Sequence, residues 1–505
     1  MTRYWKKIVF LLAVRMLAGG SIVRAAAGGD GREAREARNF YVDINGNDHG
    51  EGSLRHPFKS LRAVNRLRLR PGDSVFLHGG QVFDGTLKIE NGGGGTAERS
   101  VFMGAYGEGW PVIRARDSSG LVLYRSHYLT IRHLRLEGSG RKGGNVKDGL
   151  AIVDCHHITV TETAITGFQK AGLMIYSSMD VLIDGVVAQG NGAAGIAVEG
   201  SEGKRSCRNL RIVGCRADDN PGDPTNLTNH SGNGIVAGHC TNLLIERCSA
   251  TNNGWDMPRI GNGPVGIWCY EADSVIIQHC LAYNNKTSVG GADGGGFDLD
   301  GGVTHSIIQY CLSYGNQGSG YCIFQYWGAS PWHDNIIRYN ISEDDGGVSD
   351  SRAGGYVWNS SGDADQFHDC QVYNNTVYNS REAALSYSEK SARRGFVFYN
   401  NIFVGRDSLI RGDRGADVFE GNDWWVLRGG AAMPGALYMN PSFAEPGNTR
   451  VRSVRALAGY NKYRLPPRSS LREKGLDLRR SFEIETGGLD FSGHRAPLRG
   501  IGASF

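Results

Sequence analysis

A unit of about 30 residues repeats along the middle of the chain, and this repeat restricts the possible folds more than any other feature. Each copy contains a short run rich in Ile and Val, which predicts a strand because it is too short for a helix. The last residues of five successive runs lie 33, 32, 31 and 29 positions apart; they are Cys215, Cys248, Cys280, Cys311 and Asn340. One such unit cannot bury its apolar face alone, so the units must stack into a solenoid.

A second kind of short run begins with glycine and alternates with the first kind along the chain. Six copies start at Gly172, Gly195, Gly234, Gly266, Gly296 and Gly320. The first and third positions after each glycine are apolar, so we expect them to face the core, while the second and fourth positions face outward. The signatures of leucine-rich repeats and of four-stranded propeller blades are missing. Strand runs without hairpin turns at this period predict an all-β fold, a coiled parallel β-helix.

The cysteines fit this interpretation better than they fit a disulfide framework. Four of the ten occupy one repeat position, and Asn340 takes the same position in the next unit. Equivalent positions on neighbouring coils lie about 4.8 Å apart with parallel side chains, which suits disulfide geometry poorly. We therefore expect a ladder of buried thiols.

The N-terminal segment has the layout of a secretory signal peptide. Residues 1–27 start with three basic side chains, continue with an apolar run at 8–14 and end in small residues that suit cleavage after Ala27. We expect residues 28–38 to be a polar linker and the mature protein to be secreted, extracellular or periplasmic. No other stretch is long and apolar enough to span a membrane, so no membrane association is expected once the signal is removed.

The two ends of the mature chain resemble those of a known superfamily. Residues 41–48, 57–61 and 69–75 resemble the N-terminal cap of secreted polysaccharide-active β-helices, and residues 490–493 with 500–503 resemble their C-terminal phrase. The chain thus resembles right-handed parallel β-helix proteins of the pectin-lyase-like superfamily. The resemblance is specific for the fold and not for the reaction, because lyases, hydrolases, epimerases and binding proteins share this scaffold.

The resulting expectation is a single-stranded right-handed parallel β-helix solenoid with an N-terminal cap and a C-terminal flanking segment. Residues 39–128 would form the cap and first coils, residues 129–430 the regular β-helix, and residues 431–505 a segment packed on its flank. A capped solenoid of this kind is expected to be a monomer.

The candidate site lies on the outward positions of the glycine-initiated runs. Asp298 and Asp300 are two residues apart on one predicted strand, in the glycine-rich segment 293–302. Aromatic residues that suit stacking on sugar rings lie one unit before and after them: Trp268, Tyr270 and Phe324. Further substrate contacts are predicted at Tyr326, Trp327 and Arg352. This arrangement predicts a groove that binds a polysaccharide.

The first functional hypothesis is a glycoside hydrolase. The Cα atoms of Asp298 and Asp300 would lie about 6.5–7 Å apart, a separation that suits the carboxylates of an inverting glycosidase. Mutual repulsion would raise the pKa of one of them and separate the acid and base roles. Glu271 is a candidate third catalytic carboxylate, and this reaction requires no cofactor.

The second hypothesis is a calcium-dependent lyase that cleaves a uronic-acid polymer by β-elimination. Asp293, Asp298 and Asp300 would supply oxygen ligands for Ca²⁺, and Lys286 or Arg352 would act as the base. The structural alternative is a solvated acidic face, or a Ca²⁺ site that only stabilises the stack.

The third hypothesis is a non-catalytic carbohydrate-binding surface protein. Nucleic acid is not an expected partner, because the 55 basic and 51 acidic side chains nearly balance and form no block of like charge. The same balance neither requires nor excludes a uronic-acid substrate.

Overall fold

The computed structural model describes residues 36–90, 92–348, 353–388, 391–429 and 436–505. The chain separates into two compact units, Met1–Glu36 and Ala37–Phe505, and the β-helix lies in the second. The predicted signal peptide and most of the predicted linker lie outside the described residues. In the ranges given above, no helix is long and apolar enough to cross a membrane.

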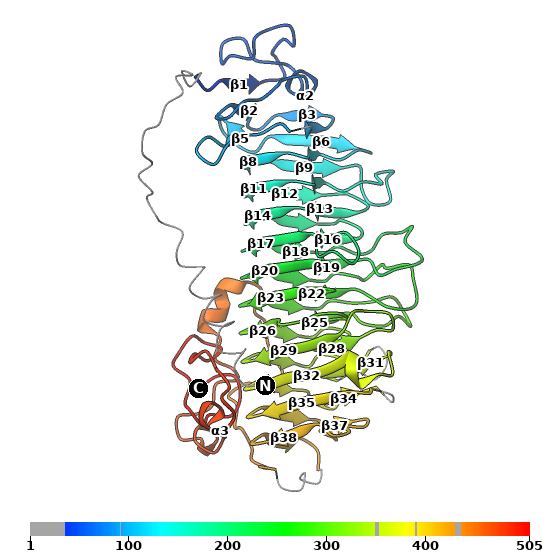
Figure 1. Ribbon diagram of the computed structural model, residues 1–505, viewed down its shortest axis with the longest axis vertical. Coiled ribbons are helices and arrows are strands. Elements are labelled where there is room, and N and C mark those ends of the chain that lie inside the picture. Colours follow the sequence, from blue (N-terminus) through cyan, green and yellow to red (C-terminus); the bar gives the residue numbers. More distant parts are fainter. Residues whose placement is uncertain (1–35, 91, 349–352, 389–390, 430–435) are drawn as a thin grey trace. The chain divides into compact units, whose positions relative to one another are not determined.

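In the described part of the second unit, the strands form three long parallel sheets that run along the coil (Figure 1). Sheet A contains β1 (Asn39–Val42), β2 (Ser74–His78), β5 (Val101–Tyr106), β8 (His127–Arg132), β11 (His156–Thr161), β14 (Met179–Asp184), β17 (Cys207–Val213), β20 (Cys240–Glu246), β23 (Asp273–Gln278), β26 (Ile307–Gln309), β29 (Trp332–Arg338), β32 (Phe367–Tyr373), β35 (Arg394–Tyr399) and β38 (Val418–Glu420).

Sheet B contains β3 (Val82–Asp84), β6 (Val112–Arg116), β9 (Arg135–Gly138), β12 (Ala164–Thr166), β15 (Val187–Gln189), β18 (Arg216–Asp218), β21 (Ser249–Thr251), β24 (Leu281–Tyr283), β27 (Leu312–Tyr314), β30 (Ile341–Glu343), β33 (Thr376–Tyr378), β36 (Ile402–Gly405) and β39 (Asp423–Val426). Sheet C contains β4 (Leu87–Glu90), β7 (Leu121–Tyr124), β10 (Leu150–Val153), β13 (Ala171–Tyr176), β16 (Ala194–Glu199), β19 (Asn233–Gly238), β22 (Val265–Tyr270), β25 (Gly295–Leu299), β28 (Tyr321–Gln325), β31 (Gly355–Asn359), β34 (Leu385–Tyr387) and β37 (Ile410–Arg411).

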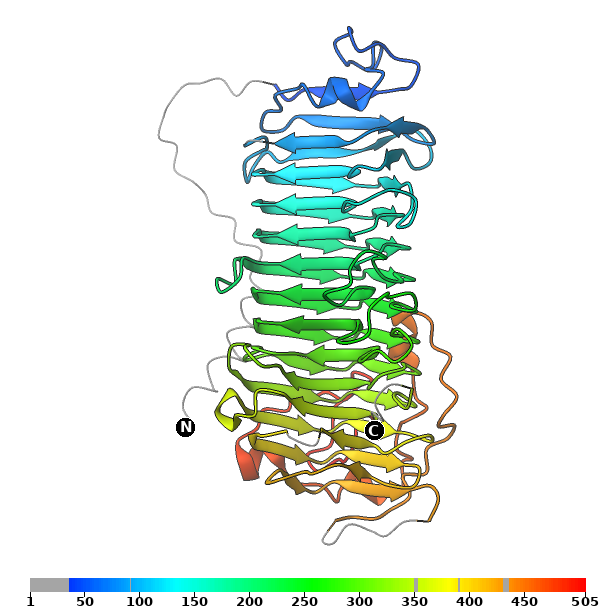
Figure 2. The same cartoon turned by 90° about the vertical axis from the view of Figure 1, so that its right-hand side faces the viewer.

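In the part of the chain that the structure describes, helices are short and lie outside the sheets. They are α2 (Leu61–Val64), α3 (Leu478–Phe482), and the 3-10 turns η1 (Ala364–Gln366), η2 (Val454–Gly459) and η3 (Ser470–Arg472). Figure 2 shows the strands stacked rung upon rung, which confirms the all-β parallel β-helix.

The interior of the coil is apolar, as the alternation of the glycine-initiated runs predicts. The first and third positions after glycine are buried in all six runs; in two of them they are Leu173 with Ile175 and Ile267 with Cys269. Trp332 is also fully buried and donates from Nε1 to the carbonyl of Leu299, 2.9 Å away. The core therefore includes the first residue of β29.

The predicted cysteine ladder is confirmed. Cys215, Cys248, Cys280 and Cys311 are buried free thiols. The backbone N–H of Cys248 donates to the sulfur of Cys280, and the N–H of Cys280 donates to that of Cys311, both at 3.4 Å. The ladder then continues through asparagine side chains at Asn340, Asn375, Asn401 and Asn422.

A second ladder of buried side chains, five amides and a final carboxyl group, lines another turn of the coil. Its members are Asn191, Asn220, Asn253, Asn285, Asn316 and Asp345. In each step the side-chain oxygen of one residue accepts from the backbone N–H of the residue one coil earlier. These bonds satisfy buried backbone groups where the chain leaves sheet B and returns to sheet C.

The C-terminal segment packs on the lower coils through buried polar contacts (Figure 1). The carboxylate of Glu343 on β30 accepts from the backbone N–H of Thr449 at 2.7 Å and from the Tyr463 hydroxyl at 2.6 Å. Arg338 on β29 donates to the carbonyl of Glu485 at 2.6 Å. These contacts hold residues 436–505 against the helix.

We predict that Asn253→Ala lowers the free energy of unfolding by about 2–4 kcal/mol, because it leaves several buried hydrogen-bonding groups without partners. The Asn253 side chain donates to the carbonyl of Ala217 at 2.9 Å and accepts from the N–H of Asn220 at 3.0 Å. Urea unfolding followed by circular dichroism measures the change. Asn448→Ala is the control, since Asn448 is exposed and lies outside both ladders; equal midpoints for the two variants would contradict the prediction.

Candidate active site

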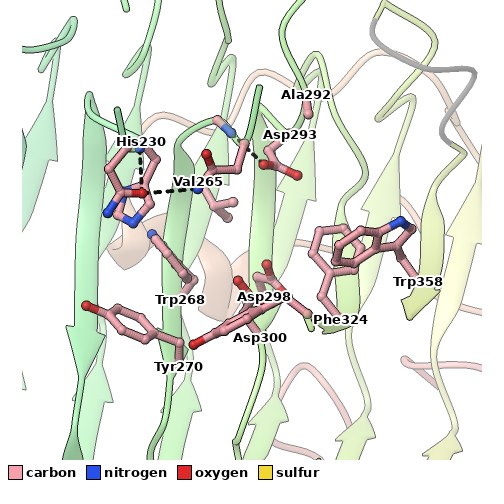
Figure 3. Close-up of a pocket in the computed structure, with 14 residues that line it drawn as sticks. His230, Val265, Trp268, Tyr270, Ala292, Asp293, Asp298, Asp300, Phe324 and Trp358 are labelled. Atoms are coloured by element: carbon pink, nitrogen blue, oxygen red, sulfur yellow. Dashed lines mark hydrogen bonds between the residues drawn. The ribbon is translucent and has the colours of Figure 1, made fainter. Parts of the chain in front are cut away.

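A pocket of about 520 Å³ opens on the outer face of sheet C, across β22, β25, β28 and β31. It lies within the size range of small-molecule sites. Its lining consists of Asn229, His230, Asn262, Gly263, Val265, Trp268, Tyr270, Ala292, Asp293, Asp298, Asp300, Phe324, Tyr326 and Trp358. Figure 3 shows Asp298 and Asp300 between Trp268 and Tyr270 on one side and Phe324 and Trp358 on the other.

Strand register brings these side chains together. Trp268 on β22 pairs with Asp298 on β25, and Phe324 on β28 pairs with Trp358 on β31. Because outward positions of neighbouring coils stack at about 4.8 Å, the aromatic and acidic side chains form adjacent rungs on one face.

The aromatic wall on β22 is held in place by hydrogen bonds. The indole Nε1 of Trp268 donates to the side-chain oxygen of Asn233 at 3.0 Å. The ring of Tyr270 lies over Gly238 of the preceding coil, and its hydroxyl donates to Glu199. Glu199 also bonds the Nδ1 atom of His239 at 2.7 Å. Both rings are therefore fixed before any ligand binds.

Loops between sheets B and C form the opposite edge of the pocket. Asp293 has a left-handed backbone conformation, φ 62°, and its carboxylate accepts from the N–H of Gly263 at 2.6 Å. The Asn262 side chain donates to that of Asn229 at 3.1 Å. These contacts tie three successive loops together over sheet C.

The three pocket carboxylates have different environments. Asp298 is only 1% exposed, whereas Asp293 and Asp300 are half-buried. The pKa of Asp300 is raised to about 7: burial is the main cause, the Gly301 N–H opposes the shift, and the negative charges of Asp293 and Glu271 add to it. Asp300 is thus a carboxyl group that holds its proton close to neutral pH.

Several residues predicted for the site lie elsewhere. Glu271 does not line the pocket; its carboxylate accepts from the N–H of Ser330 at 2.8 Å. Trp327 is 80% exposed and also lies outside the lining. Lys286 is half-buried in the loop after β24 and does not line the pocket. Arg352 lies outside the described residues.

Four lining residues with polar or aromatic side chains were not predicted from the sequence: Asn229, His230, Asn262 and Trp358. Trp358 had a detectable signal, because the run 354–358 continues the glycine-initiated pattern by one more coil and places Trp358 at its fourth, outward position. The other three lie on loops, where the repeat pattern gives no information on position.

The carboxylates of the pocket do not converge on one point. Within the described ranges, His305, His333 and Asp334 form the single group of three or more His, Cys, Asp or Glu residues whose ligand atoms lie within 4.8 Å of one another. That group belongs to sheet A and the turn before β26, away from the pocket lining. The ligand oxygens of Asp293, Asp298 and Asp300 do not all lie within 4.8 Å of one another, so these carboxylates do not form a closed set around one point.

Known proteins share this architecture. A lacto-N-biosidase from Bifidobacterium longum subsp. longum is 31% identical over 134 residues, which are 25% of this chain and 8% of that much longer protein. Among solved structures, a GH136 lacto-N-biosidase from Eubacterium ramulus matches with a TM-score of 0.52 and 19% identity, covering 74% of this chain and 68% of that one. The PL6 family alginate lyase AlyGC matches with a TM-score of 0.51 and 15% identity, covering 76% and 53%.

The two structural likenesses concern the fold, which hydrolases and lyases share. A family described as "Pel9A-like, right handed beta helix region" matches residues 40–344, more than half of the chain. This match also confirms the right-handed coil expected from the sequence. The chain belongs to this Pel9A-like right-handed β-helix family.

Proposed function

We propose that this protein hydrolyses glycosidic bonds and that Asp300 donates the proton to the leaving group. The observation that carries the proposal is a carboxyl group with a pKa raised to about 7 in a pocket walled by aromatic rings. A general acid works best when its pKa lies near the working pH. The stretch that is 31% identical to a lacto-N-biosidase, a glycoside hydrolase by name, supports the same reaction class.

The aromatic rings serve as sugar-binding surfaces in this proposal. Trp268 and Tyr270 lie with ring centroids 5.3 Å apart on the side of the preceding coils, and Phe324 with Trp358 lies on the other side. Their apolar faces suit the C–H faces of pyranose rings. A glycosidic oxygen bound between the two walls would lie next to Asp300.

The second carboxylate has two candidates. Asp298 lies on β25, two residues before Asp300, which follows the end of that strand, and this spacing suits an inverting pair. Asp293 faces the pocket from the loop, is more exposed than Asp298, and its charge acts on Asp300. Because the second carboxylate must contact water or the sugar, solvent access favours Asp293.

A calcium-dependent lyase is the second candidate function, because three carboxylates line one pocket and polysaccharide lyases share the fold. The described lining residues include no Lys or Arg to act as its base. Ca²⁺ held by Asp293, Asp298 and Asp300 would acidify the proton next to a uronate carboxylate. The hydrolase is favoured because these carboxylates do not converge on one point and because Asp300 holds its proton close to neutral pH.

Asp300→Asn is expected to lower kcat by about 10²–10⁴-fold on an unactivated glycoside, because the amide cannot donate the proton. The loss should be much smaller on an aryl glycoside whose phenolate leaves without protonation. For the wild-type protein, kcat should fall as the pH rises through about 7, since Asp300 then loses its proton.

The matched control is Asp184→Asn, which removes an exposed carboxylate on sheet A. It should leave the rate and the pH profile unchanged. An Asp300→Asn variant with wild-type activity on both substrates would rule out the assigned role.

Chemical rescue separates the two candidates for the second carboxylate. We expect azide to restore turnover of an aryl glycoside in Asp293→Asn, because a small anion can fill the vacated position and attack the sugar. Asp298→Asn should lose activity without rescue, since its side chain is almost fully buried. Detection of a glycosyl azide by mass spectrometry measures this, and rescue of Asp298→Asn alone would transfer the role to Asp298.

Gly238→Ala is expected to raise KM about tenfold with a smaller effect on kcat, because it displaces one sugar-binding wall. A Cβ atom at Gly238 would lie 2.3 Å from the ring of Tyr270. The comparison variant is Tyr270→Phe, which keeps the ring and removes only the bond to Glu199. Steady-state kinetics on one oligosaccharide compares the two, and an unchanged KM in Gly238→Ala would argue against Tyr270 as a binding surface.

A further inference from the structure

His230 lines the pocket beside Trp268, on a loop that the repeat pattern did not predict. The two rings meet edge to face, with centroids 4.8 Å apart and an interplanar angle of 74°. The imidazole therefore forms part of the surface that a bound sugar would meet next to the aromatic wall (Figure 3).

The protonation of this imidazole is fixed by Asn233, the first residue of β19. The side-chain oxygen of Asn233 accepts from the indole Nε1 of Trp268 at 3.0 Å and from the backbone N–H of Val265 at 3.3 Å. Both of these groups can only donate, so the orientation of the amide is determined. The amide nitrogen must then be the atom that faces His230 and the carbonyl of Ala193, at 3.0 and 3.2 Å.

An amide NH₂ group donates and cannot accept, so the Nδ1 atom of His230 accepts this bond and carries no proton. The proton of the neutral ring therefore resides on Nε2. Among the described residues, Nε2 has no hydrogen-bond partner.

The ring also stays uncharged at working pH. Burial lowers the pKa of His230 to about 4; the charge of Asp293 opposes this shift and that of Arg259 adds to it. Asn233, Trp268 and the loop around Asn229 contribute no charge to the ring. Above a pH of about 5, His230 is a neutral donor.

We propose that His230 is a fixed, uncharged Nε2–H donor that binds a neutral oxygen of the substrate, a hydroxyl or an amide carbonyl of an uncharged sugar, and that Asn233 is its positioning residue. The substrate part of this proposal rests on the proposed function. A neutral donor does not supply the positive charge that a uronate carboxylate would require, so the site selects uncharged sugar units at this end of the pocket.

The decisive test is the tautomer of His230 in the full-length protein, measured by ¹⁵N NMR of histidine-labelled samples at pH 7. His230→Gln identifies the signals. We expect a protonated Nε2 and an unprotonated Nδ1. His305 is the internal control, because its Nδ1 atom lies 2.8 Å from Asp273, which raises its pKa and requires Nδ1–H. A protonated Nδ1 in wild-type His230 overturns the proposal whether or not the protein is an active glycosidase.

The role of Asn233 is tested by Asn233→Asp in the same experiment. The new carboxylate keeps the acceptor for Trp268 and cannot donate to His230. We expect the Nδ1 atom to gain a proton at pH 7, giving the other tautomer or the imidazolium. An unchanged His230 spectrum would show that Asn233 does not set its protonation.

The substrate contact is tested by His230→Phe against His230→Gln, with p-nitrophenyl lacto-N-bioside and a panel of neutral oligosaccharides. Phe keeps a ring without a donor, and the Gln amide replaces the Nε2–H group. We expect KM to rise about tenfold in His230→Phe, equivalent to one lost hydrogen bond, and to recover partly in His230→Gln. Equal KM values for His230→Phe and the wild-type protein would overturn the proposed contact between His230 and the substrate. If the wild-type protein turns over none of these sugars, the proposed function is overturned. The tautomer measurement then still decides the protonation state of His230.

Discussion

The rung-to-rung stacking of equivalent side chains, at the spacing of parallel strands, is the constraint on which the rest of this structure depends. A parallel coil leaves polar backbone groups inside each turn, and these must be satisfied without water. The thiol and amide ladders do this from one coil to the next. Because each hydrogen bond of a ladder joins one coil to the next, the strand register is fixed along the whole stack. The outward side chains of different coils are therefore aligned as well.

The pocket is a consequence of that alignment. Trp268, Asp298 and Phe324 are far apart in sequence and lie on consecutive coils because β22, β25 and β28 pair in register. Loops between sheets B and C then cover this part of the face. Asp300 follows β25 directly at the edge of this pocket, and its burial is the main cause of its raised pKa.

The repeat was sufficient to predict the fold and the strand residues of the site, since both depend on local alternation. Asp298, Asp300, Trp268 and Tyr270 all line the pocket as expected. The loop residues could not be predicted in the same way. His230 reaches the pocket because its loop packs against the next coil, and Glu271 is turned away because it accepts from the N–H of Ser330. These positions are set by contacts between coils that no periodicity encodes.

The central claim, hydrolysis with a protonated Asp300, is tested most directly by incubating the wild-type protein with an array of neutral and uronic-acid polysaccharides and oligosaccharides. Reducing ends and the ultraviolet absorbance of unsaturated products are followed in parallel, with calcium and with a chelator. The account predicts new reducing ends without absorbance, at the same rate in chelator. Absorbance that appears with calcium and disappears with the chelator would contradict it and assign the pocket to a lyase.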